Sequence, residues 1–308
     1  MKTFILTLAL TLTSTAMAQD TTLVWPMLKV RSGVSQIRGR DAVKVKVAVD
    51  DGRMHLSPGK RTIEMDGESF RRAKMLSEAV LTVEAGQDRG SDPDTVAFGT
   101  AFHVGGNYIM TNRHVLSPRQ INWTRCNGLK VKTTAGNSYD CHQVIYCEPT
   151  TICSRNKGLE DETAFGPLMK EANNCPRTQD LCLLEVKTSR RHPFANVASV
   201  TLRGARPEPS ASAAFSTVGN SGNFGLHFSE SRGVRMVSDW RIGVKTQAFP
   251  GNSGGPLFNE QNEVVGLIYS RNNNIETFAL SMEWALNRIK EKIGEAHPAW
   301  QAMLPNIR

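Results

Sequence analysis

Three polar residues, far apart in the sequence, together carry the groups that acyl transfer requires. A serine that attacks a carbonyl at neutral pH needs a base to take its proton, a carboxylate to orient that base, and N–H donors that face the developing oxyanion. His114 in "TNRHVL", Asp180 in "QDLCLLEV" and Ser253 in "GNSGG" can supply the base, the carboxylate and the nucleophile. Because glycines permit a sharp turn, we expect the N–H groups of Gly251 and Ser253 to point at one spot.

Other histidines and aspartates compete for these roles. His103 lies in the middle of an expected strand, which favours a packed or surface residue, and Asp180 alone among the candidate acids directly precedes a buried-looking strand. The rivals that lack an adjoining strand and turn are His55, His142, His192, His227 and His297, and the competing acids are Asp140 and Asp161.

The elements that must position these residues are short strands. From residue 79 onward, short runs of Val, Ile, Leu and Phe alternate with Gly, Asn, Asp and Ser, which is typical of an all-β sandwich or barrel. The clearest passages are a hairpin over 96–116 that turns at 105–107, an apolar run within 179–186, and a hairpin over 254–270 that turns at "NEQN".

The chain changes character near its end. Met282, Leu286, Ile289 and Ile293 recur at helical spacing, with Ser281 as a plausible N-cap and Gly294 just beyond the last turn. We therefore expect one C-terminal α-helix whose apolar stripe docks on the barrel.

The N-terminal residues 1–18 have the pattern of a secretory signal peptide. Lys2 precedes an apolar run that is far shorter than the ~20 residues a membrane span needs, and small residues end at Ala18. We expect a mature chain that starts at Gln19, is secreted or periplasmic, and has no membrane span. Residues 19–75 read as an extension or prosegment, with a strand at 42–49 and a turn at 57–60.

Six cysteines gather in one part of the chain: Cys126, Cys141, Cys147, Cys153, Cys175 and Cys182. An even number in an exported protein predicts up to three disulfides, whose pairing the sequence leaves open. A metal site is disfavoured because no Cys-x-x-Cys pair occurs. The net charge of +8 permits weak attraction to anions, but the basic residues are scattered among acids, so we expect no nucleic-acid partner.

The segments "GTAFHV...TNRHVL", "RTQDLCLLEV" and "GNSGGPLF" resemble the signature blocks of the chymotrypsin-like (trypsin-like) serine peptidases, closest to the HtrA-type and glutamyl-endopeptidase-like bacterial branch. The resemblance implies two six-stranded antiparallel barrels over 76–294, no cofactor, and a triad of Ser253 as nucleophile, His114 as general base and Asp180 as its partner. The oxyanion hole would be formed by Gly251 and Ser253. We expect 295–308 to be a short tail without a PDZ module.

The same resemblance separates two serines that both stand in "GNSG". Ser253 is followed by "PLF" and a hairpin, as the family requires, whereas Ser221 lies in a segment similar to the family's "GNPFGL" loop. We therefore interpret Ser221 as a turn residue.

Two departures from the family pattern bear on activation and specificity. Asn252 replaces the acid that pairs with a new N-terminus in many members, so we expect that removal of 19–75 is not needed to form the oxyanion hole. Gln247 stands where trypsin-like members carry the acid that binds Arg or Lys substrates, and Ile268 stands where glutamyl endopeptidases carry a His. With Tyr269 nearby, a pocket of Gln247, Ile268 and Tyr269 predicts small or apolar side chains before the scissile bond.

The sequence thus predicts an exported serine endopeptidase that acts on protein or peptide substrates. The alternative is a catalytically silent protease-like scaffold that binds a protein partner, with the extension in the cleft. The oligomeric state and the natural substrate stay open.

Overall fold

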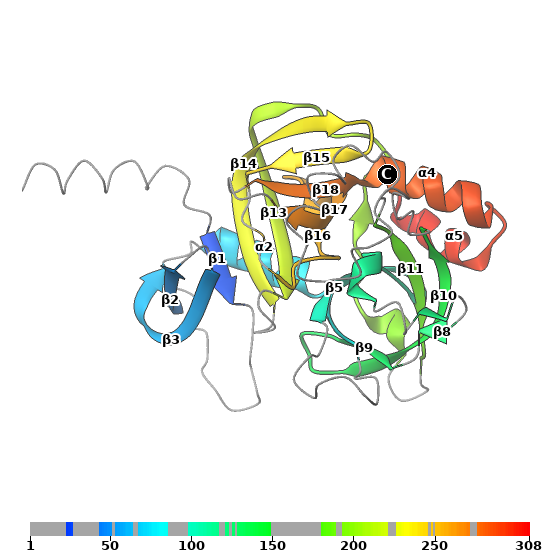
Figure 1. The fold of residues 1–308 in the computed structure, drawn as a ribbon, viewed down its shortest axis with the longest axis horizontal. Coiled ribbons are helices and arrows are strands. Elements are labelled where there is room, and N and C mark those ends of the chain that lie inside the picture. The colour runs from blue at the N-terminus through cyan, green and yellow to red at the C-terminus, as the bar shows by residue number, and fades with distance from the viewer. Residues whose placement is uncertain are drawn as a thin grey trace, which may run out of the picture.

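Strands dominate the computed structural model, as the short apolar runs predict, and Figure 1 shows two barrels beside each other with the two C-terminal helices at one end. The structure describes residues 23–26, 43–50, 53–63, 67–85, 98–116, 121–122, 125–126, 128–148, 180–188, 193–220, 226–245, 248, 250–271 and 276–308.

The first barrel is a closed ring of six antiparallel strands in the order β10-β11-β6-β5-β4-β9. Their bounds are β4 (Val80–Ala85), β5 (Phe98–Gly105), β6 (Tyr108–Thr111), β9 (Leu129–Lys132), β10 (Ser138–Cys147) and β11 (Cys182–Val186). The predicted hairpin is β5–β6, and the predicted apolar run is β11. Both expectations are confirmed.

The second barrel also has six antiparallel strands. The path β14-β13-β16-β17-β18-β15 closes on itself because β14 also pairs with β15. Their bounds are β13 (Ser210–Asn220), β14 (Leu226–Ser238), β15 (Arg241–Val244), β16 (Pro256–Phe258), β17 (Glu263–Arg271) and β18 (Thr277–Ser281). The hairpin expected at "NEQN" is β16–β17, and the all-β two-barrel fold is confirmed.

The remaining elements lie outside the two barrels. They are β1 (Leu23–Pro26), β2 (Val43–Asp50), β3 (Arg53–Ile63), β7 (Ile121–Asn122), β8 (Arg125–Cys126), β12 (Thr201–Leu202), α2 (Gly67–Ser77), α4 (Met282–Ile293), α5 (Pro298–Met303) and the 3₁₀ turns η1 (Arg113–Val115), η3 (Phe194–Asn196) and η5 (Leu304–Asn306). Among the residues that the structure describes, no helix is long and apolar enough to cross a membrane.

Helix α4 is the expected C-terminal helix and docks as its apolar stripe predicts. Met282, Leu286 and Ile289 are buried in the largest apolar cluster, together with side chains of both barrels. Gly294 ends the helix with a positive φ of 83°. Ser281 stands at the N-cap position but its hydroxyl makes no capping bond, because the residue is also the last of β18 and is completely buried. After α4 the chain forms α5 and η5.

The N-terminal segments contact the second barrel. Strand β1 pairs antiparallel with β14, and β2 pairs with β3 in a separate hairpin. The strand expected at 42–49 is β2, whereas the turn expected at 57–60 lies inside β3, where the pairing shifts register opposite Val45. Helix α2 straddles the boundary expected between residues 75 and 76, and its Ala73 and Leu76 are buried in the core.

Four of the six cysteines form two disulfides, Cys126–Cys141 and Cys147–Cys182. The second joins residues that face each other across β10 and β11. Cys153 and Cys175 lie outside the described residues, as do residues 1–18.

Candidate active site

His114 and Asp180 meet because β6 and β11 are antiparallel neighbours. Thr111 at the end of β6 pairs with Cys182 at the start of β11. The segment after β6, which carries His114, therefore lies beside the segment before β11, which carries Asp180. The backbone N–H of His114 donates to Asp180 Oδ1 at 2.9 Å, and the ring Nδ1 contacts Asp180 Oδ2. This contact holds the ring by its Nδ1 side.

The environment of His114 sets its proton affinity. Burial opposes the charged imidazolium, but the charge of Asp180 and its hydrogen bond outweigh that effect, so the pKa of His114 is raised above its ordinary value of 6.5. The His114 side chain is 40% exposed and that of Asp180 is 20% exposed. The imidazole is therefore open to solvent on one side and held by a carboxylate on the other.

Ser253 lies in the tight turn before β16, and two glycines make this turn possible. Gly251 has φ of 97° and Gly254 has φ of 83°, a region that side chains disfavour. A Cβ on Gly251 would lie 2.0 Å from the Asn220 carbonyl oxygen, and one on Gly254 would lie 2.0 Å from that of Thr100. Glycine at positions 251 and 254 of "GNSGG" is thus a steric requirement of this turn.

The first barrel braces this turn of the second barrel. Thr100 on β5 donates its N–H to the Ser253 carbonyl at 2.9 Å, and its hydroxyl donates to the Gly251 carbonyl at 2.7 Å. The same hydroxyl accepts the N–H of Asn220 at 2.8 Å. Thr100 is fully buried, so its bonds fix the half-buried Ser253 relative to the barrel that carries His114.

Asn112 connects the Asp180 segment to the Ser253 turn. Its Nδ2 donates to the Asp180 carbonyl at 2.6 Å, while its Oδ1 accepts the N–H of Gly254 at 2.6 Å. The side chain is completely buried. The sequence interpretation missed Asn112, although it lies two residues before His114 within the same motif.

The expected nucleophile and base are thus brought to the same junction, but no hydrogen bond joins the Ser253 hydroxyl to His114 among the described residues. Such contacts often tighten only when substrate is bound. Within the same described portion, the N–H groups of Gly251 and Ser253 have no hydrogen-bond acceptor.

The expected specificity residues have different environments. The Ile268 side chain is buried in the interior of the second barrel, and its carbonyl accepts the N–H of Gly254 at 2.8 Å. Tyr269 is half-buried, and burial raises its pKa, with nearby Arg241 opposing and Asp180 adding to that effect. Gln247 lies outside the described residues.

The competing residues take other places. His103 is buried, with its ring nitrogens against the carbonyls of Val197 and Gly106, and His297 caps α5 by accepting the N–H of Ala299. His227 is buried on β14, whereas His142 and Asp140 are exposed on β10. The side chains of His55, His192, Asp161 and Ser221 are outside the described part. In that part, no group of three or more His, Cys, Asp or Glu side chains could hold a metal ion.

Comparison with known proteins agrees with this arrangement. The family described as "trypsin-like peptidase domain" matches residues 99–267, more than half of the chain, and this range includes His114, Asp180 and Ser253. No curated protein matches the chain.

Solved structures also resemble the chain at low identity. An inactive serine-to-alanine mutant of Rv3671c from Mycobacterium tuberculosis has a TM-score of 0.49 and 15% identity, over 73% of this chain and 91% of its own. The serine endoprotease from Yersinia pestis has a TM-score of 0.48 and 16% identity, over 74% of this chain and 67% of its own.

Proposed function

Because the chain belongs to the trypsin-like peptidase family, and is therefore a serine-protease-type hydrolase, we propose that it is an exported endopeptidase that uses Ser253, His114 and Asp180. The single observation that carries the proposal is the buried Asn112 side chain, which binds both the Asp180 segment and the Ser253 turn next to the His114–Asp180 contact.

The proposed reaction proceeds through an acyl-enzyme. The Ser253 oxygen attacks the substrate carbonyl while His114 Nε2 takes the hydroxyl proton, and the N–H groups of Gly251 and Ser253 bind the oxyanion. The C–N bond then breaks as His114 returns that proton to the leaving amine. Water, deprotonated by His114, attacks the acyl group and releases the acid and the free serine.

Covalent labelling with a fluorophosphonate tests this proposal. The purified chain should be labelled on Ser253, and Ser253→Ala should abolish both labelling and peptide hydrolysis. Ser221→Ala is the matched control, because it changes the serine of the other "GNSG" segment, and it should label normally. If the wild-type chain folds but neither labels nor cleaves, the alternative of a silent binding scaffold holds instead.

Export is the second part of the proposal. The signal-peptide pattern of residues 1–18 and the two disulfides both fit an oxidising compartment. N-terminal sequencing of the exported chain should give Gln19 as the first residue. A chain retained in the cytoplasm with Met1 intact would contradict this part alone.

For specificity, we propose cleavage after small or apolar residues, through a pocket near Gln247, Ile268 and Tyr269. A peptide library should therefore show little cleavage after Arg, Lys or Glu. Dominant cleavage after any of these three would refute the preference and leave the serine mechanism intact.

A further inference from the structure

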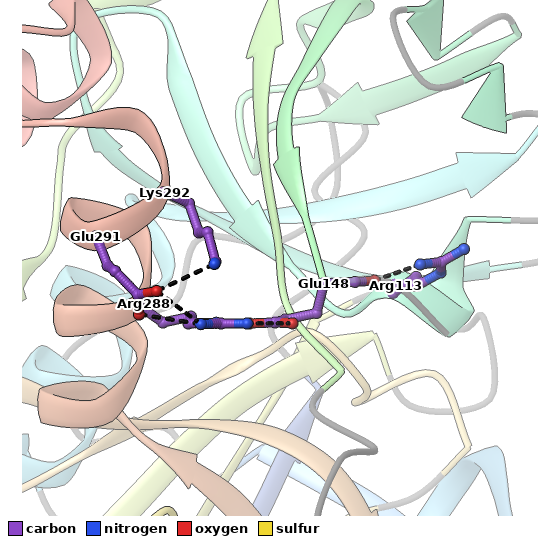
Figure 2. Close-up of polar contacts among 5 residues, drawn as sticks. All are labelled: Arg113, Glu148, Arg288, Glu291 and Lys292. Carbon is purple, nitrogen blue, oxygen red and sulfur yellow. Dashed lines mark hydrogen bonds and ion pairs between the residues drawn. The ribbon is translucent and has the colours of Figure 1, made fainter. Parts of the chain in front are cut away.

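Resting on that proposed function, we propose that Glu148 and Arg288 are positioning residues that couple the C-terminal helix α4 to the His114–Asp180 pair. Figure 2 shows Glu148 between Arg288 of α4 and Arg113, the neighbour of His114.

The backbone of Glu148 is bound on both sides to the segments that carry the pair. Its N–H donates to the Leu181 carbonyl at 2.9 Å, and Leu181 directly follows Asp180. Its carbonyl accepts a hydrogen bond from the Arg113 guanidinium, and Arg113 directly precedes His114. A shift of residue 148 would therefore reach both members of the pair.

The side chain of Glu148 is what fixes this position. Its carboxylate is only 3% exposed and receives the Arg288 guanidinium on both oxygens, from Nε to Oε1 and from Nη2 to Oε2 at 3.5 Å. Paired contacts of this kind fix geometry as well as charge. A buried carboxylate also needs its cation, because removing one partner leaves an uncompensated charge.

Arg288 is itself held in place on the helix. It also contacts Glu291 one turn along α4, at 3.0 Å, and Glu291 contacts Lys292 (Figure 2). The neighbouring Glu148 carboxylate raises the pKa of Arg288, and together with burial it raises that of Tyr146. Arg288 is 26% exposed on the helix, and Arg288→Lys keeps a cation beside Glu148, so this variant tests the position without leaving the buried carboxylate uncompensated.

The test compares Arg288→Met, Arg288→Lys, Glu148→Gln and the double variant Arg288→Met/Glu148→Gln. The concentration of active sites is set by fluorophosphonate titration, so that kcat refers to folded, competent enzyme. Lys290→Met is the matched control: it removes a long cation from the same helix, whose exposed partner is Glu295.

Displacement of catalytic groups by about 1 Å can cost ~10²-fold in rate, and a loosened anchor should produce part of that loss. We expect Arg288→Met to lower kcat roughly tenfold with KM nearly unchanged. Arg288→Lys should recover part of the rate, the double variant should be no slower than the slower single variant, and Lys290→Met should match the wild type.

Several results would overturn the coupling. The first is a wild-type kcat per labelled site in both Arg288→Met and Glu148→Gln. The second is a change that affects only the melting temperature or only KM. The third is a double variant whose loss of kcat equals the sum of the two single losses. A wild-type chain that neither labels nor cleaves would instead refute the proposed function itself, and the coupling would fall with it.

Discussion

Replacing Asn112 is the sharpest perturbation of the junction between the two barrels. Asn112→Ala deletes two hydrogen bonds of a completely buried side chain. An unmade bond at a buried carbonyl costs about 1–3 kcal/mol, and the Asp180 carbonyl, which is only partly buried in this contact, should lie in the lower part of that range. The loss at Gly254 is smaller, because its N–H keeps the Ile268 carbonyl at 2.8 Å. We expect the free energy of unfolding to fall by about 1–3 kcal/mol in total.

The isosteric change Asn112→Asp separates the two bonds. When ionised, the new carboxylate still accepts the Gly254 N–H but presents a second acceptor to the Asp180 carbonyl; when protonated, it can donate its O–H to that carbonyl, as the amide does in the wild type. Burial raises the pKa of this carboxyl above its unfolded value of about 3.9, so the folded variant retains its proton to higher pH. The variant is therefore closest to wild type in acid, and its relative stability falls as pH rises through the raised pKa.

Urea unfolding at pH 4.5 and pH 7.5 measures both effects. The stability deficit of Asn112→Asp relative to wild type should be larger at pH 7.5, while that of Asn112→Ala should vary little between the two. Asn137→Ala, at an exposed position, should change stability by less than about 0.5 kcal/mol. A deficit in Asn112→Asp that is equal at both pH values, or no deficit in Asn112→Ala, would refute this reasoning.

Three further predictions concern the base, the turn and the extension. Since His114 must be neutral to accept a proton and its pKa is raised, kcat/KM should rise with pH through an apparent pKa above 6.5; a midpoint at or below 6.5 contradicts this. Gly251→Ala should lower kcat by ~10²-fold or more, because it disturbs one N–H donor of the proposed oxyanion hole, and single-turnover kinetics would measure this loss. Normal turnover would count against the proposed oxyanion hole. Deleting 19–77 should lower the melting temperature far more than deleting 19–66, because only the former removes Ala73 from the core; equal melting temperatures would show that α2 is dispensable.

Local patterns in the sequence were enough to predict much of the fold. The turn at 105–107, the "NEQN" turn and the helical spacing of Met282, Leu286 and Ile289 depend on residues close in sequence, and each gave the expected element. The turn expected at 57–60 was wrong. Its Pro and Gly residues fall within β3, where the pairing with β2 shifts register, so they mark an irregularity in the strand and not a reversal of the chain.

The supporting contacts of the site could not be predicted in the same way. Asn112 and Glu148 act through backbone groups of Asp180, Gly254 and Leu181, which come near only once strands distant in sequence are paired in register. Backbone partners carry no residue-type signature, so composition and spacing do not reveal them. His114, Asp180 and Ser253, in contrast, stand out by their side-chain chemistry together with the strands, turns and family motifs beside them in the sequence.

The brace that Thr100 provides also has a consequence during synthesis. The turn around Ser253 belongs to the barrel that the ribosome makes second, yet its backbone is bound to a strand of the barrel made first. A nascent chain that has completed only the first barrel thus lacks the turn that carries Ser253, the proposed nucleophile. We therefore expect the proposed protease site to form only after both barrels are complete.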